Sequence, residues 1–189
     1  TFHARGTRGQ RMDVVTIWDQ ETLSPLGEVV WPEPKRFIGI PQRDAMLLLD
    51  NDLFLAVANF SPATSVTLID LDTRKIVNEI PTPGCTLTYH TGPLGFSSLC
   101  ADGRFLSTEL AKDGSIKNQT RTAAFFSSDD SPIYERPAVI DNVAYFPSLA
   151  GLVHPVDMSL EIYDALSGNF VRKITDFGQE TPLLMHGAR

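Results

Sequence analysis

The feature that most constrains the fold is a strand-turn-strand unit that occurs three times. In the first two copies, at residues 13–30 and 64–80, an apolar run ends in Asp-x-x-Thr and a second extended run follows. The third copy covers residues 159–168, and its second run covers residues 170–174. Such a unit recurring at a period of about 40–50 residues is typical of a β-propeller. The sequence therefore predicts an all-β propeller, with residues 1–189 in a single and incomplete domain.

The spacing of the aspartates that close each predicted third strand supports this period. They are Asp19, Asp70, Asp113 and Asp157, at steps of 51, 43 and 44 residues. The next such aspartate follows only 7 residues later, which is too short for a blade. We therefore predict that sequence is missing near residues 157–159. The chain would then supply about four blades and a fragment of a larger ring.

Short runs rich in Val, Ile, Thr, Phe and Tyr, separated by Gly, Pro, Asp and Asn, predict strands throughout. The expected strands cover residues 13–19, 26–31, 45–49, 53–59, 65–69, 76–80, 86–89, 95–99, 104–110, 115–120, 138–140, 143–147 and 152–156. Residues 1–11 are basic and polar and are expected to form a loop that enters the first strand. Trp18 occupies the position of Ile69 and Tyr163 in the other copies, so we expect it to pack between blades.

Composition excludes several classes of partner. The chain has 42% hydrophobic residues, enough for a core, and a formal net charge of −7. Phosphate binding needs an excess of Lys and Arg, so no nucleic-acid partner is expected. No apolar run approaches the roughly 20 residues of a membrane span, so no membrane partner is expected either.

No motif in the chain forms a self-sufficient catalytic site. The Asp-x-x-Thr turns are interpreted as structural, with side chains that bind backbone amides. The histidines are scattered without ligand spacing, at positions 3, 90, 154 and 186. His90 follows Tyr89 at a strand end and could face a partner, and Asp129-Asp130 reads as a solvated connection rather than a calcium loop. We predict no catalytic, cofactor-binding or metal-binding residue in this chain.

Two cysteines, Cys85 and Cys100, lie 15 residues apart near strand edges. A disulfide closing a loop of this length stabilises a protein by about 3 kcal/mol and implies an oxidising compartment. Two buried free thiols are the alternative. The residues by themselves leave both possibilities open.

Several segments resemble one family. They are residues 8–19, 34–37, 59–66, 84–85, 99–103, 129–133 and 136–138. Together they are similar to the heavy subunit of the quinoprotein amine dehydrogenases, which include methylamine and aromatic amine dehydrogenases. The resemblance runs from about residue 4 to residue 157 and continues more weakly over residues 159–174. Residues 61–65 and 119–121 lean toward the aromatic amine branch, and the tail at residues 176–189 resembles nothing.

The resemblance implies a seven-bladed propeller and a disulfide between Cys85 and Cys100. It also implies a periplasmic heterotetramer of two heavy and two light chains. The cofactor, tryptophan tryptophylquinone, would be built from two tryptophans of the separate light subunit, so Trp18 and Trp31 are not that cofactor. Electrons would pass to a blue copper protein of the azurin or amicyanin type.

Two other propeller functions are alternatives to an amine dehydrogenase subunit. A WD40-like interaction scaffold would carry repeated Gly-His and Trp-Asp signatures, but Trp-Asp occurs only once, at Trp18-Asp19. A lactonase would need metal-binding carboxylates and asparagines around the axis, and the sequence offers no convincing set. Both are therefore less well supported by the sequence.

Overall fold

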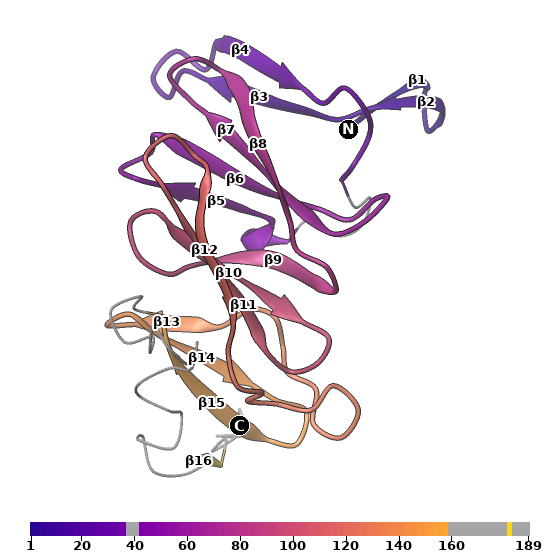
Figure 1. Cartoon of the computed structure of the whole chain (residues 1–189). Coiled ribbons are helices and arrows are strands. Elements are labelled where there is room, and N and C mark those ends of the chain that lie inside the picture. Colours follow the sequence, from indigo (N-terminus) through magenta and orange to yellow (C-terminus); the bar gives the residue numbers. More distant parts are fainter. Residues whose placement is uncertain (37–41, 159–180, 183–189) are drawn as a thin grey trace.

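The computed structural model describes residues 1–36, 42–158 and 181–182, and these residues form strands joined by turns (Figure 1). A single short 3-10 helix, η1 (Arg43–Ala45), occurs within the described residues. The strands are β1 (Phe2–Arg5), β2 (Arg8–Met12), β3 (Val14–Trp18), β4 (Pro25–Val30), β5 (Met46–Leu49), β6 (Phe54–Asn59), β7 (Ser65–Asp70), β8 (Lys75–Pro81), β9 (Cys85–His90), β10 (Gly95–Cys100), β11 (Phe105–Leu110), β12 (Ile116–Arg121), β13 (Ala138–Ile140), β14 (Val143–Pro147), β15 (Leu152–Asp157) and β16 (Thr181–Pro182).

The strands form three four-stranded antiparallel sheets and two two-stranded sheets within the described residues. The orders β5-β6-β7-β8, β9-β10-β11-β12 and β13-β14-β15-β16 each follow the chain, which is the arrangement of propeller blades. The sheets follow one another in an arc, from β3-β4 at one end to β13-β16 at the other (Figure 1). The predicted all-β propeller fold is confirmed.

The hydrophobic core lies in the seams between consecutive sheets. In the sheet β5-β8, Leu55, Val57 and Ile69 pack toward β3-β4, whereas Phe54 and Leu68 belong to the cluster shared with the sheet β9-β12. A third cluster joins β9-β11 to β14 and β15. Because both faces of the middle sheets are covered, their inner strands β6, β7, β10 and β11 are buried almost continuously instead of in an alternating pattern.

Trp31, which follows β4, lies in the first of these seams. Its side chain is 4% exposed, and its indole Nε1 donates a hydrogen bond of 3.0 Å to Thr67 Oγ1. Asn59 Nδ2 donates to the same hydroxyl at 2.7 Å. The seam between the first two sheets therefore contains polar contacts as well as apolar packing.

Trp18 corrects a sequence expectation. It was predicted to pack between blades, but its side chain is 57% exposed, whereas its counterpart Ile69 is fully buried. Ile69 lies in a sheet flanked by sheets on both sides, and the sheet β3-β4 has a described neighbour on one side only. Equivalent positions in the repeat therefore differ in burial because their sheets have different neighbours.

Residues 1–11 also differ from the expectation of a loop. They form the hairpin β1-β2, with Phe2 opposite Met12 and Arg5 opposite Arg8. The third repeat copy at residues 159–168, the run at residues 170–174 and, apart from residues 181–182, the tail at residues 176–189 lie outside the described residues. The predicted break near residues 157–159 stays a prediction.

Candidate functional site

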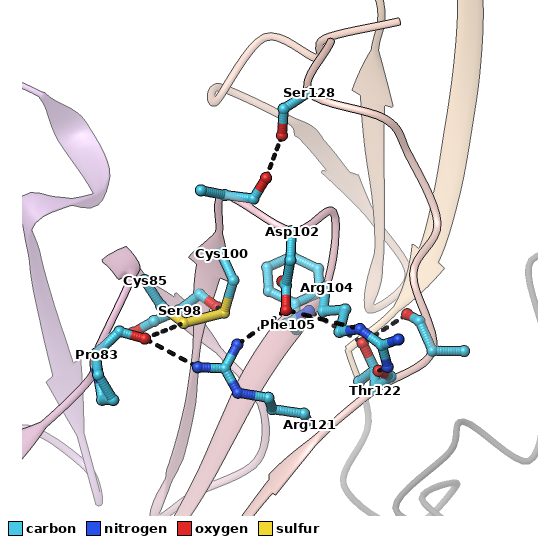
Figure 2. A network of polar contacts seen from close by, with 12 residues as sticks. Pro83, Cys85, Ser98, Cys100, Asp102, Arg104, Phe105, Arg121, Thr122 and Ser128 are labelled. Atoms are coloured by element: carbon cyan, nitrogen blue, oxygen red, sulfur yellow. Dashed lines mark hydrogen bonds and ion pairs between the residues drawn. A yellow bond between two sulfur atoms is a disulfide. The ribbon is translucent and has the colours of Figure 1, made fainter. Parts of the chain in front are cut away.

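Cys85 and Cys100 form a disulfide, the pairing that the family resemblance implies (Figure 2). Cys85 begins β9 and Cys100 ends β10, and the two residues are directly opposite in the antiparallel register. Both are buried, at 1% and 2% exposure. The disulfide therefore joins the entrance of one blade to the turn between its second and third strands.

Polar contacts surround this disulfide and connect three segments (Figure 2). The guanidinium of Arg121 donates to the Pro83 carbonyl at 2.9 Å and to the Asp102 carboxylate at 3.2 Å. Arg104 donates to the Thr122 carbonyl at 3.0 Å, and Ser128 Oγ donates to the Ala101 carbonyl. The segments before β9, after β10 and after β12 are thereby held in one arrangement.

A cavity of about 400 Å³ lies beside the disulfide. Its wall is mainly apolar and includes both cysteines together with Phe60, Leu99, Phe126, Pro132 and Ile133. Among the described residues that line it, Glu135 is the only one with a carboxyl side chain. An apolar cavity of this size suits a small apolar group, but it presents no nucleophile paired with a base.

A second cavity, of about 440 Å³, lies where the first strands of three sheets, β5, β9 and β13, come together. Asp44 lines it, and burial raises the pKa of that carboxyl against the opposing charges of Arg43 and Arg136. His90, which we expected could face a partner, is exposed at the end of β9 and lines the same cavity.

Tyr89 lies on the wall of this second cavity. Burial, followed by the negative charges of Asp44 and Glu135, raises the pKa of Tyr89. Its hydroxyl donates a hydrogen bond of 2.8 Å to the Glu135 carbonyl. Tyr89 is therefore neutral and occupied in a structural contact, which gives it no role as a base.

Asp13 is a buried carboxylate with an extensive set of donors. It accepts hydrogen bonds from Thr1 Oγ1, from the backbone amides of Lys35 and Arg36, and from the guanidinium of Arg11 at 3.0 Å. Burial alone would raise the pKa of Asp13, but these hydrogen bonds and the charge of Arg11 outweigh it and lower the pKa. The carboxylate is ionised and fully engaged, so it fixes structure instead of performing chemistry.

The Asp-x-x-Thr turns are structural, as predicted. The Asp19 carboxylate accepts hydrogen bonds from the backbone amide and the hydroxyl of Thr22, and these lower its pKa. Asp70 accepts one from the Thr73 amide, with the same effect on its pKa. None of these carboxylates is available to a ligand without breaking its turn.

The remaining candidates do not come together in one site within the described residues. Asp130 is exposed and accepts a hydrogen bond from Ser127 Oγ, in keeping with a solvated connection. His3 lies in β1, His154 is buried in β15, and His186 is outside the described residues. Over the described part of the chain, no three His, Cys, Asp or Glu side chains gather where they could hold a metal ion. No helix there has the length and apolar character needed to cross a membrane.

Two features escaped the sequence analysis. One is the Asp13 cluster, because Asp13 was interpreted only as the start of a strand and its partners at residues 35 and 36 are distant in sequence. The other is the hairpin β1-β2. Its turn contains Gly6 at φ +62° between Arg5 and Arg8, and a glycine in a two-residue connection is a hairpin signal.

Comparison with known proteins identifies the family. A family model described as methylamine dehydrogenase heavy chain matches residues 1–167. The methylamine dehydrogenase heavy chain of Methylorubrum extorquens is 28% identical over 164 residues, which cover 84% of this chain and 39% of the relative. That of Paracoccus versutus is 29% identical over 164 residues, covering 85% of this chain and 38% of the relative. The chain thus spans about two fifths of the length of these relatives.

Among solved structures, the hydrazine synthase of Kuenenia stuttgartiensis superposes with a TM-score of 0.51 at 12% identity. The superposition covers 77% of this chain and 46% of that one. At this identity the likeness concerns the fold alone. The family model, in contrast, covers residues 1–167 and therefore the strands from β1 to β15. The chain belongs to the methylamine dehydrogenase heavy chain family.

Proposed function

We propose that this chain is part of the heavy subunit of a periplasmic amine dehydrogenase that oxidatively deaminates primary amines. The observation that carries the proposal is the family match over residues 1–167. In this proposal the quinone cofactor, tryptophan tryptophylquinone, belongs to a separate light subunit. The heavy chain holds that subunit, and two such heavy–light pairs associate into a heterotetramer. A blue copper protein accepts the electrons.

The geometry supports a holding role for this chain. The cavity beside the disulfide and the cavity at β5, β9 and β13 contain no paired nucleophile and base. Asp13, Asp19, Asp70 and Tyr89 are engaged in turns or structural contacts. The loops around the Cys85–Cys100 disulfide are cross-linked to each other and to the segment after β12. Rigid sheets with loops fixed in this way suit precise placement of a partner.

We further propose that aromatic amines are preferred over methylamine, from the resemblance at residues 61–65 and 119–121. The first segment joins β6 to β7, and its Thr64 lines the cavity beside the disulfide. The second segment is in β12, where Arg121 contacts Pro83. Both segments therefore lie close to the same disulfide-containing region of the fold.

The test is purification of the complex from its native source. We expect a light subunit with quinone absorbance to co-purify, and we expect turnover of an arylalkylamine with a blue copper protein as acceptor. A colourless protein without a light subunit would contradict the proposal and favour an interaction scaffold. Turnover of methylamine but not of an arylalkylamine would contradict only the substrate preference.

A further inference from the structure

The hairpin β1-β2 has a charge that sets it apart from the remainder of the chain. Residues 1–12 contain Arg5, Arg8 and Arg11 and no acidic residue, whereas all 23 Asp and Glu residues lie outside this segment. Arg5 and Arg8 are exposed and directly opposite each other next to the turn. The hairpin extends away from the sheet β3-β4 (Figure 1). It therefore presents a local positive charge on an acidic protein.

The hairpin has a fixed place on the body of the protein. Arg11 donates to the Asp13 carboxylate at 3.0 Å and to the Arg36 carbonyl at 2.9 Å. The same carboxylate accepts the backbone amide of Lys35 at 2.9 Å. Asp13 is fully buried and the Arg11 side chain is 19% exposed, so these contacts are largely removed from solvent. The positive charge is thus held in a defined orientation.

Apolar side chains lie at the base of the hairpin. Phe2 and Met12 are opposite each other in the register, so they share one face. They are 61% and 50% exposed, and Val30 at the end of β4 is 46% exposed. These three side chains, with His3 and Arg11, line a cavity of about 440 Å³ between the hairpin and the end of β4. The cavity combines an apolar wall with basic groups.

Two nitrogen atoms in this wall have no hydrogen-bond partner. His3 Nδ1 and Arg11 Nε are buried, and neither is hydrogen-bonded within the described structure. Arg11 Nε is an N–H group, and a buried N–H without an acceptor carries a desolvation cost of about 1–3 kcal/mol, which an incoming acceptor would recover. A carboxylate is the acceptor that a guanidinium binds best.

From these observations we propose that the β1-β2 hairpin and its cavity form a docking site for a protein partner. That partner would present a carboxylate next to an apolar side chain. The apolar group would enter the wall of Phe2, Met12 and Val30, and the carboxylate would meet Arg11. Arg5 and Arg8 would steer the approach. This inference rests on the proposed function, in which an electron-accepting protein must associate and leave repeatedly, as small charged interfaces allow.

The test uses the purified heavy–light complex and a blue copper protein as the probe. The rate constant for its reduction is measured against protein and salt concentration after addition of an amine. R5E/R8E is expected to lower the second-order rate constant at low ionic strength by about tenfold, with the difference shrinking as salt is added. F2S is expected to weaken association at all salt concentrations, because it removes apolar contact instead of charge.

The matched control is K75E/K112E, which makes the same charge change at exposed lysines near the β7-β8 and β11-β12 turns. It is expected to change the rate constant less than R5E/R8E does. Equal effects of the two double variants, or a loss with R5E/R8E that salt does not reduce, would overturn the docking site while leaving the function intact. The docking site would also be overturned if R5E/R8E reduced the probe at the wild-type rate but no longer formed a dimer of the heavy–light complex in sedimentation. The hairpin would then bind a second copy of the complex. A wild-type complex that oxidises no amine would overturn both.

Discussion

A single buried carboxylate, that of Asp13, determines how the first twelve residues meet the rest of the chain. Its partners come from Thr1, from Arg11 and from the backbone at residues 35 and 36. The local sequence around residue 13 does not predict these hydrogen bonds. Each partner is a common donor, and two of the partners are backbone amides, which every residue except proline offers. Sequence reasoning placed the strand after Asp13 correctly but had no basis for assigning the side chain a role.

Replacing Asp13 with alanine is expected to destabilise the protein by about 3 kcal/mol, because it leaves Arg11 and two backbone amides without their buried acceptor. The free energy of unfolding from urea titration measures this. Asp72→Ala, at an exposed turn position, is the control, with an expected change within about 0.5 kcal/mol. Similar losses for both variants would contradict the role assigned to Asp13.

Asp13 also predicts how stability depends on pH. Its pKa in the folded protein is lowered below the ordinary value of 3.8, so the folded state binds fewer protons than the unfolded state near that pH. The resulting stabilisation is present above pH 3.8 and is lost as the pH falls through the folded pKa. Asp13→Asn is expected to flatten this acid-side loss in urea unfolding measured from neutral pH down to about pH 3. An unchanged slope would contradict the prediction.

At the level of strands and turns, local sequence patterns predicted where the turns lie, because the side chain of a turn residue binds groups only a few positions away. Asp19 and Asp70 bind amides of their own turns, so spacing alone located them. The burial of Trp18 could not be deduced in the same way, since it depends on which sheet lies alongside. The cavity walls likewise combine residues from three or more segments, and a single sequence gives no direct measure of their proximity.

The turn between β10 and β11 gives a prediction with an internal control. Gly103 and Gly84 have similar φ angles, +79° and +74°. A Cβ at Gly103 would lie 2.0 Å from the Phe126 carbonyl oxygen, whereas one at Gly84 would meet nothing within 4 Å. Gly84→Ala is expected to cost about 1–2 kcal/mol from backbone strain alone. Gly103→Ala is expected to cost at least about 2 kcal/mol more, as measured by urea unfolding. Equal costs would show that the contact with Phe126 relaxes freely.

The disulfide that joins β9 to β10 closes a loop with a sequence separation of 15 residues. C85S/C100S is expected to lower the free energy of unfolding by about 3 kcal/mol, because the unfolded chain regains the freedom that the cross-link removes. Wild-type protein treated with a thiol reductant should show the same loss. If the double variant and the untreated wild type unfold at the same urea concentration, this contribution is absent.

On the scale of the whole molecule, the described sheets form an arc and not a closed ring (Figure 1). Val139 and Ile140 of the last sheet and Trp18 of the first are more than half exposed. The relatives are about two and a half times as long as the stretch that they share with this chain, as the 39% coverage implies. Both observations agree with the proposal that these sheets are sectors of a seven-bladed ring.

The proposed break near residues 157–159 can be tested directly on the native polypeptide. We expect its intact mass to exceed the 20.8 kDa of the 189 residues, because a blade needs more than the 7 residues that separate Asp157 from Asp164. Mass spectrometry of the protein from its native source, with peptide mapping across this region, measures it. A mass of 20.8 kDa would rule out missing sequence and leave a true internal deletion.

The contrast between the two tryptophans gives the protein a built-in optical reporter. The chain contains only Trp18 and Trp31, the first 57% exposed and the second 4% exposed with its indole bonded across a sheet boundary. A soluble quencher such as iodide should reach the emission of Trp18 at once but that of Trp31 only after the first two sheets separate. Iodide quenching of Trp31 therefore reports the separation of the first two sheets without any added label.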